Sequence, residues 1–255
     1  VTPASVWGPS KPTYYLIDAR GTGGAIAANR LAKANLRPGW IATPIETGGV
    51  TYPPGSLVIA YSKAAAELVP RIALQLGLRV DGVRGKTPPA TPVGGTRIAL
   101  YKPWVENIDE GWTRWLMDQY EFPYTTVTDV EIRAGRLRDR FDAIVVPSAP
   151  AHQLIAGHGR TAVPAEYAGG LGSEGTAALK AFVEAGGALI CLNESSALAI
   201  DIFRLPVRDV TADAGDRFAA PGSLVRLEVD RNSPLGYGMP STTAAFFADS
   251  AAFDG

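Results

Sequence analysis

The feature that most constrains the fold is the pattern at residues 186–199, where a glycine pair precedes a short apolar run and a polar turn. The run at 188–192 predicts a buried strand, and the small and apolar residues after the turn predict a helix. This segment contains Cys191, the one cysteine of the chain. Because α/β enzymes often present a nucleophile at such a turn, the segment bears directly on whether the chain is catalytic.

Similar runs of Ile, Val and Leu occur at residues 98–101 and 143–147, with helical patterns at 109–120 and 175–185 between them. Continuous apolar runs are typical of strands that are buried on both faces in a parallel sheet covered by helices. The sequence therefore predicts the α/β class for this region.

A smaller α/β subdomain is predicted at residues 1–95, from strands at 14–18 and 57–61 that each precede a helix. Ser62 is placed to cap the second helix, and Gly77 to end it. Residues 84–95 are rich in Gly, Pro, Thr and Lys without an apolar period, which predicts a linker. We therefore expect two domains, at residues 1–95 and 96–255. Residues 222–230 alternate with period two, which favours an antiparallel strand with one solvated face.

Composition excludes some classes of function. The 24 basic and 25 acidic residues give a net charge of −1, so no basic footprint predicts nucleic-acid binding. No apolar run approaches the roughly 20 residues of a membrane span. A single cysteine leaves the redox compartment open. The sequence begins with Val and has no signal-peptide pattern, so we expect a piece of a longer chain.

The glycine-rich turn at residues 21–24 lies between a predicted strand and a predicted helix. The third glycine of a dinucleotide fingerprint would fall at Ile26, so the fingerprint fails. A tight turn is the favoured interpretation, and anion binding at the helix N-terminus is the alternative.

Two histidines, His152 and His158, lie in one loop after the strand at 143–147. Their spacing matches no metal motif, and we expect no metal site in this chain. Ligands of α/β sheets bind at the carboxyl ends of strands, so His152 is a candidate for a ligand pocket.

The register of the strand at 188–192 places the turn on Asn193 or Glu194 and leaves Cys191 inside the strand. No histidine follows Cys191 to serve as its base, which favours a buried, unreactive thiol. Catalysis by Cys191 remains the alternative. The polar residues Asn193, Glu194 and Ser195, with His152, are the predicted lining of a small-ligand pocket, and Ser195 could also cap the next helix.

Three of the five tryptophans lie in residues 101–115. Trp112 and Trp115 have helical spacing, so we predict that they pack in the core while Asp109 and Glu110 favour the helix N-terminus. The alternative is a carbohydrate- or peptide-binding module built on Trp104 to Trp115.

Several sequence blocks resemble the region that follows the catalytic domain in large bacterial M14-family zinc carboxypeptidase-like proteins. They are RIALYKPW at 97–104, DEGWTRW at 109–115, YEFPY at 120–124, FDAI at 141–144, EYAGGLG at 166–172, FVEAGG at 182–187, LPV at 205–207 and PGSL at 221–224. That region resembles a class I glutamine amidotransferase-like domain. The resemblance implies a flavodoxin-like parallel sheet with helices on both faces, preceded by the smaller subdomain.

This sequence lacks the catalytic residues of both families, and that absence sets the function that we expect. The zinc-binding His-x-x-Glu signature does not occur in this sequence, so the resemblance implies that zinc belongs to an upstream carboxypeptidase domain and that this chain holds no cofactor. The amidotransferase residues do not carry over either, because the turn reads Leu192-Asn193-Glu194 and no His-x-Glu follows. The resemblance thus implies a non-catalytic accessory domain for ligand binding, assembly or positioning of the carboxypeptidase domain. Its parent would be an exported protein, periplasmic or extracellular, with a peptide or glycan as a further ligand.

Overall fold

The computed structural model describes residues 5–214, 218–248 and 250–255. Contacts divide the chain into two units: Val1–Gly95 with Tyr120–Phe122 and Leu224–Ala245, and Thr96–Gln119 with Pro123–Ser223 and Phe246–Gly255. The second domain predicted at 96–255 differs from this division, because Leu224–Ala245 clusters with the first unit. Contacts remote in sequence decide this membership, such as the ring of Tyr237 lying 6.2 Å from that of Trp40.

The first unit is built on a mixed sheet with the strand order β1-β7-β2-β6-β3-β8. Its strands are β1 (Ser5–Trp7), β2 (Tyr14–Ile17), β3 (Gly39–Trp40), β6 (Leu57–Ala60), β7 (Arg79–Val83) and β8 (Thr91–Pro92), and β4 (Ile45–Thr47) pairs with β5 (Val50–Tyr52) as a hairpin. The predicted linker thus contains β8, which pairs with β3.

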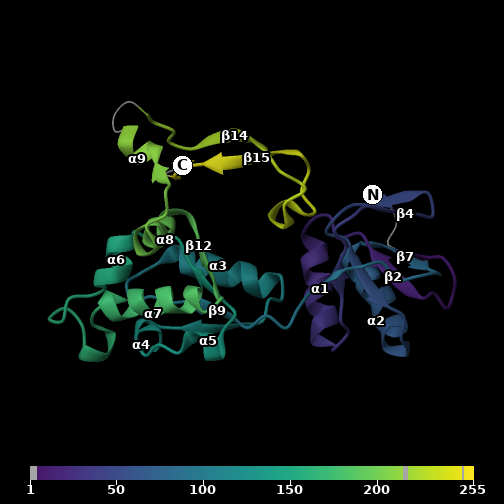
Figure 1. The fold of residues 1–255 in the computed structure, drawn as a ribbon, viewed down its shortest axis with the longest axis horizontal. Helices are drawn as coiled ribbons and strands as arrows, with labels where there is room; N and C mark the ends of the chain where they lie inside the picture. The colour runs from purple at the N-terminus through teal and green to yellow at the C-terminus, as the bar shows by residue number, and fades with distance from the viewer. Residues whose placement is uncertain (1–4, 215–217, 249) are drawn as a thin grey trace. The chain divides into compact units, whose positions relative to one another are not determined.

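Helices α1 (Thr22–Lys33) and α2 (Lys63–Leu76) pack against each other and against one face of this sheet (Figure 1). The predicted ends of α2 are confirmed. The Ser62 hydroxyl accepts a hydrogen bond from the Ala65 amide at 3.0 Å, and Gly77 ends the helix in the left-handed conformation. On the opposite face, the buried Tyr52 donates a hydrogen bond of 2.6 Å to the buried Asp81.

The second unit contains a parallel sheet with the strand order β10-β9-β11-β12. Its strands are β9 (Ile98–Tyr101), β10 (Tyr124–Val127), β11 (Ala143–Val146) and β12 (Ala188–Cys191). Its helices are α3 (Ile108–Gln119), α4 (Asp129–Arg133), α5 (Leu137–Arg140), α6 (Ala151–Ala156), α7 (Gly172–Glu184) and α8 (Ser196–Phe203). The α/β class predicted for this region is confirmed.

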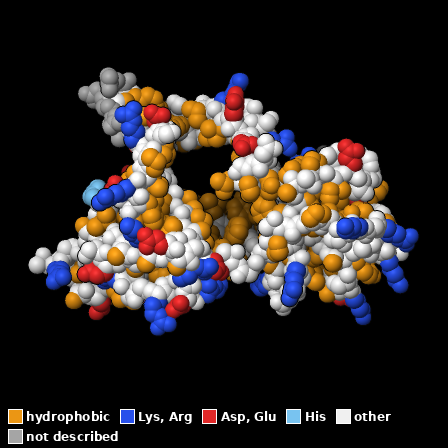
Figure 2. All heavy atoms as spheres, viewed as in Figure 1, with side chains coloured by type: hydrophobic (Ala, Val, Ile, Leu, Met, Phe, Trp, Pro, Cys, Tyr) orange, Lys and Arg blue, Asp and Glu red, His pale blue; other side chains and the backbone are white. Residues whose placement is uncertain are grey.

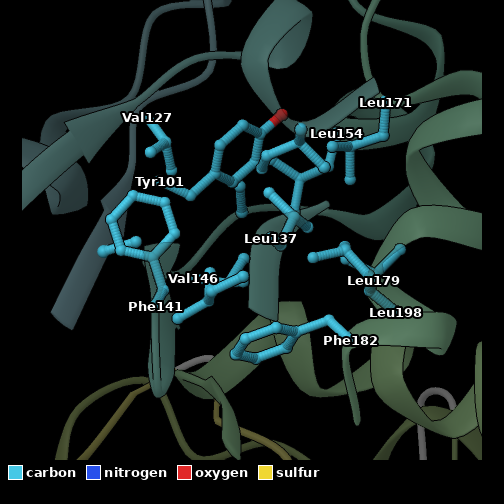
Figure 3. Packing of buried hydrophobic residues seen from close by; sticks show 14 residues of the cluster. Tyr101, Val127, Leu137, Phe141, Val146, Leu154, Leu171, Leu179, Phe182 and Leu198 are labelled. Carbon is cyan, nitrogen blue, oxygen red and sulfur yellow. The ribbon is translucent and has the colours of Figure 1, made fainter. Parts of the chain in front are cut away.

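One face of this sheet forms the core of the second unit, where α7 contacts α4, α5, α6 and α8. Figure 3 shows the aromatic rings of Tyr101, Phe141 and Phe182 around Leu137 and Val146. The Tyr101 hydroxyl donates a hydrogen bond to the buried carboxylate of Asp129. Burial and this carboxylate both raise the pKa of Tyr101.

The other face is covered unevenly, which corrects the prediction that all these strands are buried on both faces. The register aligns Leu100, Val145 and Ile190 side by side on that face. Leu100 is buried, Val145 is half-buried and Ile190 is 45% exposed. Exposure on this face therefore rises from β9 toward the edge strand β12.

The prediction that Trp112 and Trp115 pack in the core is wrong. Their side chains are 59% and 51% exposed on α3. Helical spacing shows that the two residues share a face, but it does not say which face turns toward the sheet.

The remaining described elements are short. They are the 3-10 turns at Ala165–Tyr167, Asn193–Ser195 and Pro234–Gly236, the paired strands β13 (Arg208–Asp209) and β16 (Phe253–Asp254), the helix α9 (Val210–Ala214), and the paired strands β14 (Ser223–Glu228) and β15 (Thr242–Phe247). The strand predicted at 222–230 corresponds to β14, whose residues are almost all exposed.

Figure 2 shows charged side chains of both signs interspersed with hydrophobic ones on the visible face. Over the described residues, every helix is too short or too polar to cross a membrane.

Candidate functional site

A turn with a left-handed residue follows β12 at the carboxyl end of the sheet. Asn193 has a left-handed backbone with φ of 48°, which is uncommon for a residue other than glycine. The turn therefore falls on one of the two predicted residues, and Cys191 is the last residue of the strand. We call residues 192–195 the elbow.

The Cys191 thiol packs beside the core of the second unit rather than at the tip of the elbow. Burial is the main cause that raises its pKa to about 11, against opposing contributions from Ser195 and the backbone of Ala199. A nucleophilic cysteine instead needs a stabilised thiolate.

Ser195 is fully buried and fixes the elbow to the neighbouring strand. Its hydroxyl oxygen lies 2.8 Å from the carbonyl oxygen of Leu192 and 3.1 Å from that of Val146, the last residue of β11. The hydroxyl is thus used within the scaffold and does not line the pocket described next.

A pocket of about 330 Å³ opens beside the elbow. Residues from the elbow, from α8 and from three later segments of the second unit line it: Asn193, Glu194, Ala197, Ile200, Asp209, Thr211, Phe218, Ala220, Phe247, Ser250, Ala251 and Phe253. Its size is at the lower end for small-molecule sites, and its mixture of apolar walls and few polar groups is typical of them.

The polar groups of this pocket are positioned by the backbone around them. The Asn193 amide donates a 3.3 Å hydrogen bond to the Ser148 hydroxyl, which joins the carboxyl ends of β12 and β11. One carboxylate oxygen of Asp209 accepts hydrogen bonds from the Thr211 amide at 2.9 Å and the Ala252 amide at 3.3 Å. These contacts hold the loops together at the mouth of the pocket.

The pocket is acidic and aromatic in character. The exposed Glu194 brings a carboxylate to it, and the carboxylate of Asp209 is already bonded to the loops around it. The rings of Phe218 and Phe247 meet edge to face, with centroids 6.2 Å apart. This combination suits a ligand with a cationic group and an apolar body.

The histidines lie elsewhere. His152 is exposed on α6 and does not line the elbow pocket. The Nε2–H of His158 donates to the Trp104 carbonyl at 3.0 Å. His158 borders a separate cavity of about 870 Å³, together with Arg133, Arg160 and Glu174. The structure thus brings Asn193 and Glu194 together, but neither Ser195 nor His152 joins them.

The glycine-rich turn packs tightly against the preceding strand end. A Cβ on Gly24 would lie 2.4 Å from the carbonyl oxygen of Ala19, so this position requires glycine for close approach. This contact accounts for Gly24 without any bound anion.

Among the described residues, no three His, Cys, Asp or Glu side chains are grouped to hold a metal ion. No protein-family model matches the sequence, and no match is found among curated proteins or solved structures.

Sequence reasoning missed Asp209, Thr211 and the phenylalanines of the pocket. The sequence around Asp209 gave little indication of a site, because an Asp directly before a helix is an ordinary helix cap, and α9 begins at the next residue. Their proximity to the elbow depends on contacts across 15 to 60 residues of sequence, which no local pattern encodes.

Proposed function

We propose that the second unit is a non-catalytic ligand-binding domain, whose site is the elbow pocket. The observation that carries this proposal is the arrangement at the end of β12, where Asn193 and Glu194 line the pocket while Cys191 stays within the strand. The elbow keeps the backbone shape that presents a nucleophile in α/β enzymes, but it presents an amide and a carboxylate.

We further propose a flavodoxin-like, amidotransferase-like architecture for this unit. Numbered within the unit, its strands have the order 2-1-3-4, which is the beginning of the flavodoxin-like order 2-1-3-4-5. In such sheets, ligands bind at the carboxyl ends of the strands. The elbow pocket lies at that edge.

The rival function, hydrolysis or amide transfer by Cys191, has less support. A thiol with a pKa of about 11 is almost entirely protonated at neutral pH. Measuring glutaminase and esterase activity of the chain and of Cys191→Ala tests this directly. An activity that the substitution abolishes would refute the non-catalytic proposal.

The class of ligand follows from the lining. The carboxylate of Glu194 favours an ammonium group, and Phe218, Phe247 and Phe253 favour an apolar body. We propose a small amine with an aromatic or aliphatic group as the ligand. This chemistry includes amino acids and short peptide ends with a free amino group.

We also propose that this domain belongs to a larger protein. The sequence blocks that resemble M14-family proteins support an accessory domain that follows a zinc carboxypeptidase domain in an exported parent. A site for free amino groups suits a protein that acts on peptides. Zinc would then belong to the carboxypeptidase domain.

Binding of phenethylammonium, measured by calorimetry, tests the pocket. We expect Glu194→Gln to weaken binding by about tenfold, which matches the lower end of about 1.5 kcal/mol for a hydrogen bond to a charged group, because Glu194 is exposed. Glu184→Gln, which removes an exposed carboxylate on α7 outside the pocket, is the matched control and should bind like the original chain. Equal binding of phenylacetate, or equal weakening by the control, would contradict the proposed site.

A further inference from the structure

The helix α3 presents its apolar side chains to solvent. They are Ile108, Trp112, Trp115 and Leu116, which follow the i, i+4, i+7, i+8 spacing of one helix face. Their side chains are 76%, 59%, 51% and 45% exposed, respectively. The two indole rings meet edge to face with centroids 6.1 Å apart. We call these four residues the apolar stripe of α3.

The opposite face of α3 is polar and is fixed to the sheet. Arg114 forms an ion pair with Glu110 and donates a 3.0 Å hydrogen bond to the hydroxyl of Thr126 on β10. Tyr124, also on β10, donates a 2.9 Å hydrogen bond to Asp118, which lies at the border between this face and the apolar side chains. Turning the stripe inward would break these contacts and expose the ion pair, so the outward orientation is held by specific bonds.

Between residues 103 and 119, every exposed charged side chain is acidic. Glu106, Asp109 and Asp118 are exposed beside the apolar stripe. The one basic residue of α3 is Arg114, whose guanidinium is engaged with Glu110 and the sheet. The residues of the second unit contain 18 acidic and 12 basic side chains. A partner that covers the stripe therefore meets a negative rim.

We propose that the apolar stripe of α3 binds an amphipathic helix of another protein, one whose apolar face is flanked by Lys or Arg. A stripe with helical spacing accommodates the side chains of a second helix. The acidic rim selects a basic partner by charge complementarity. This surface is separate from the elbow pocket and needs no ligand there.

A second copy of this chain fits less well. Antiparallel pairing centred between Trp112 and Trp115 would set Asp109 against Asp118 of the other copy, which brings like charges together. The stripe also exposes only on the order of 500 Å². That is less than the roughly 800 Å² per partner of a standard stable interface.

The test uses the full chain and a fluorescent 18-residue Leu–Lys amphipathic helix, with a matched Leu–Glu helix as the charge control. We expect the Leu–Lys helix to bind and the combined Trp112→Gln and Trp115→Gln variant to weaken binding at least about tenfold, as for central aromatic anchors. The combined Asp109→Asn and Asp118→Asn variant should weaken binding and reduce its salt dependence. Leu74→Gln removes a 74% exposed apolar residue of α2 and should change nothing.

Several results would overturn the proposal. They are the absence of peptide binding, unchanged binding by the tryptophan variant, and equal binding of the Leu–Glu helix. A dimer in sedimentation that the tryptophan variant abolishes would identify a second copy as the occupant. Binding to a glycan array that depends on both tryptophans would identify a sugar. Protection of both indoles from iodide quenching in the free chain would mean that another segment of the chain covers the stripe.

Discussion

Alkylation of Cys191 should be slow in the folded chain, and its rate should keep rising with pH. Burial raises the pKa of this thiol from 9.0 to about 11, so the thiolate fraction at pH 8 falls about 100-fold, from about one in ten to about one in a thousand. A more basic thiolate is intrinsically more reactive, which recovers roughly a factor of ten. The net expectation at pH 8 is a rate at least about tenfold below that of the unfolded chain, before steric protection by the core.

The assay is reaction with iodoacetamide, followed by mass spectrometry, in buffer and in urea. Because the chain has one cysteine, the modified fraction reports this site alone. The rate for the folded chain should rise about tenfold per pH unit from pH 7 to 10, and it should level off only near pH 11. A plateau below pH 8, or a folded chain that reacts as fast as the unfolded one, would refute the reasoning and favour the catalytic alternative.

Further predictions concern stability and are measured by urea unfolding. Trp112→Gln and Trp115→Gln should each change the free energy of unfolding by less than about 0.5 kcal/mol, because both side chains are exposed; a loss of about 3–5 kcal/mol would show that they are buried after all. Gly24→Ala should destabilise the chain by about 1–3 kcal/mol through a backbone clash. By contrast, Gly111→Ala has open space on α3 and should stabilise it by about 0.5–1 kcal/mol, and the reverse order of these two glycine effects would contradict the described packing. Tyr101→Phe leaves a buried carboxylate without its phenol donor and should cost about 1–3 kcal/mol, whereas an unchanged midpoint would mean that this bond is unimportant.

Local structure was the most predictable part of the fold. The cap at Ser62, the left-handed Gly77 and the turn at Asn193 all follow from side-chain hydrogen bonding and backbone sterics within a few residues. Three parallel strands of the second unit, β9, β11 and β12, were equally readable, because their apolar runs are continuous. The fourth, β10, was not predicted, because its sequence YTTV carries two threonines and lacks such a run.

The candidate site was only half predictable. Asn193 and Glu194 follow from the register of one strand, so the sequence places them at its carboxyl end. Asp209 and Phe218 complete the pocket from segments further along the chain, and the hydroxyl of Ser195 is taken by two carbonyl groups of the scaffold. Such assignments depend on which loops meet, and that is settled by packing over long sequence separations.

The sequence by itself determined the α/β class, the positions of the main helices and strands, and the residues that share a helix face. Hydrophobic period and capping chemistry act within one element, so they are visible in the order of residues. Only the tertiary structure decided that β12 is an exposed edge, that residues 224–245 cluster with the first unit, and that Trp112 and Trp115 face solvent. The physical reason is that the hydrophobic period of a helix determines which of its side chains share a face, but contacts with other elements determine whether that face points to the core or to solvent. In α3, the hydrogen bond from Arg114 to Thr126 holds the polar face against the sheet.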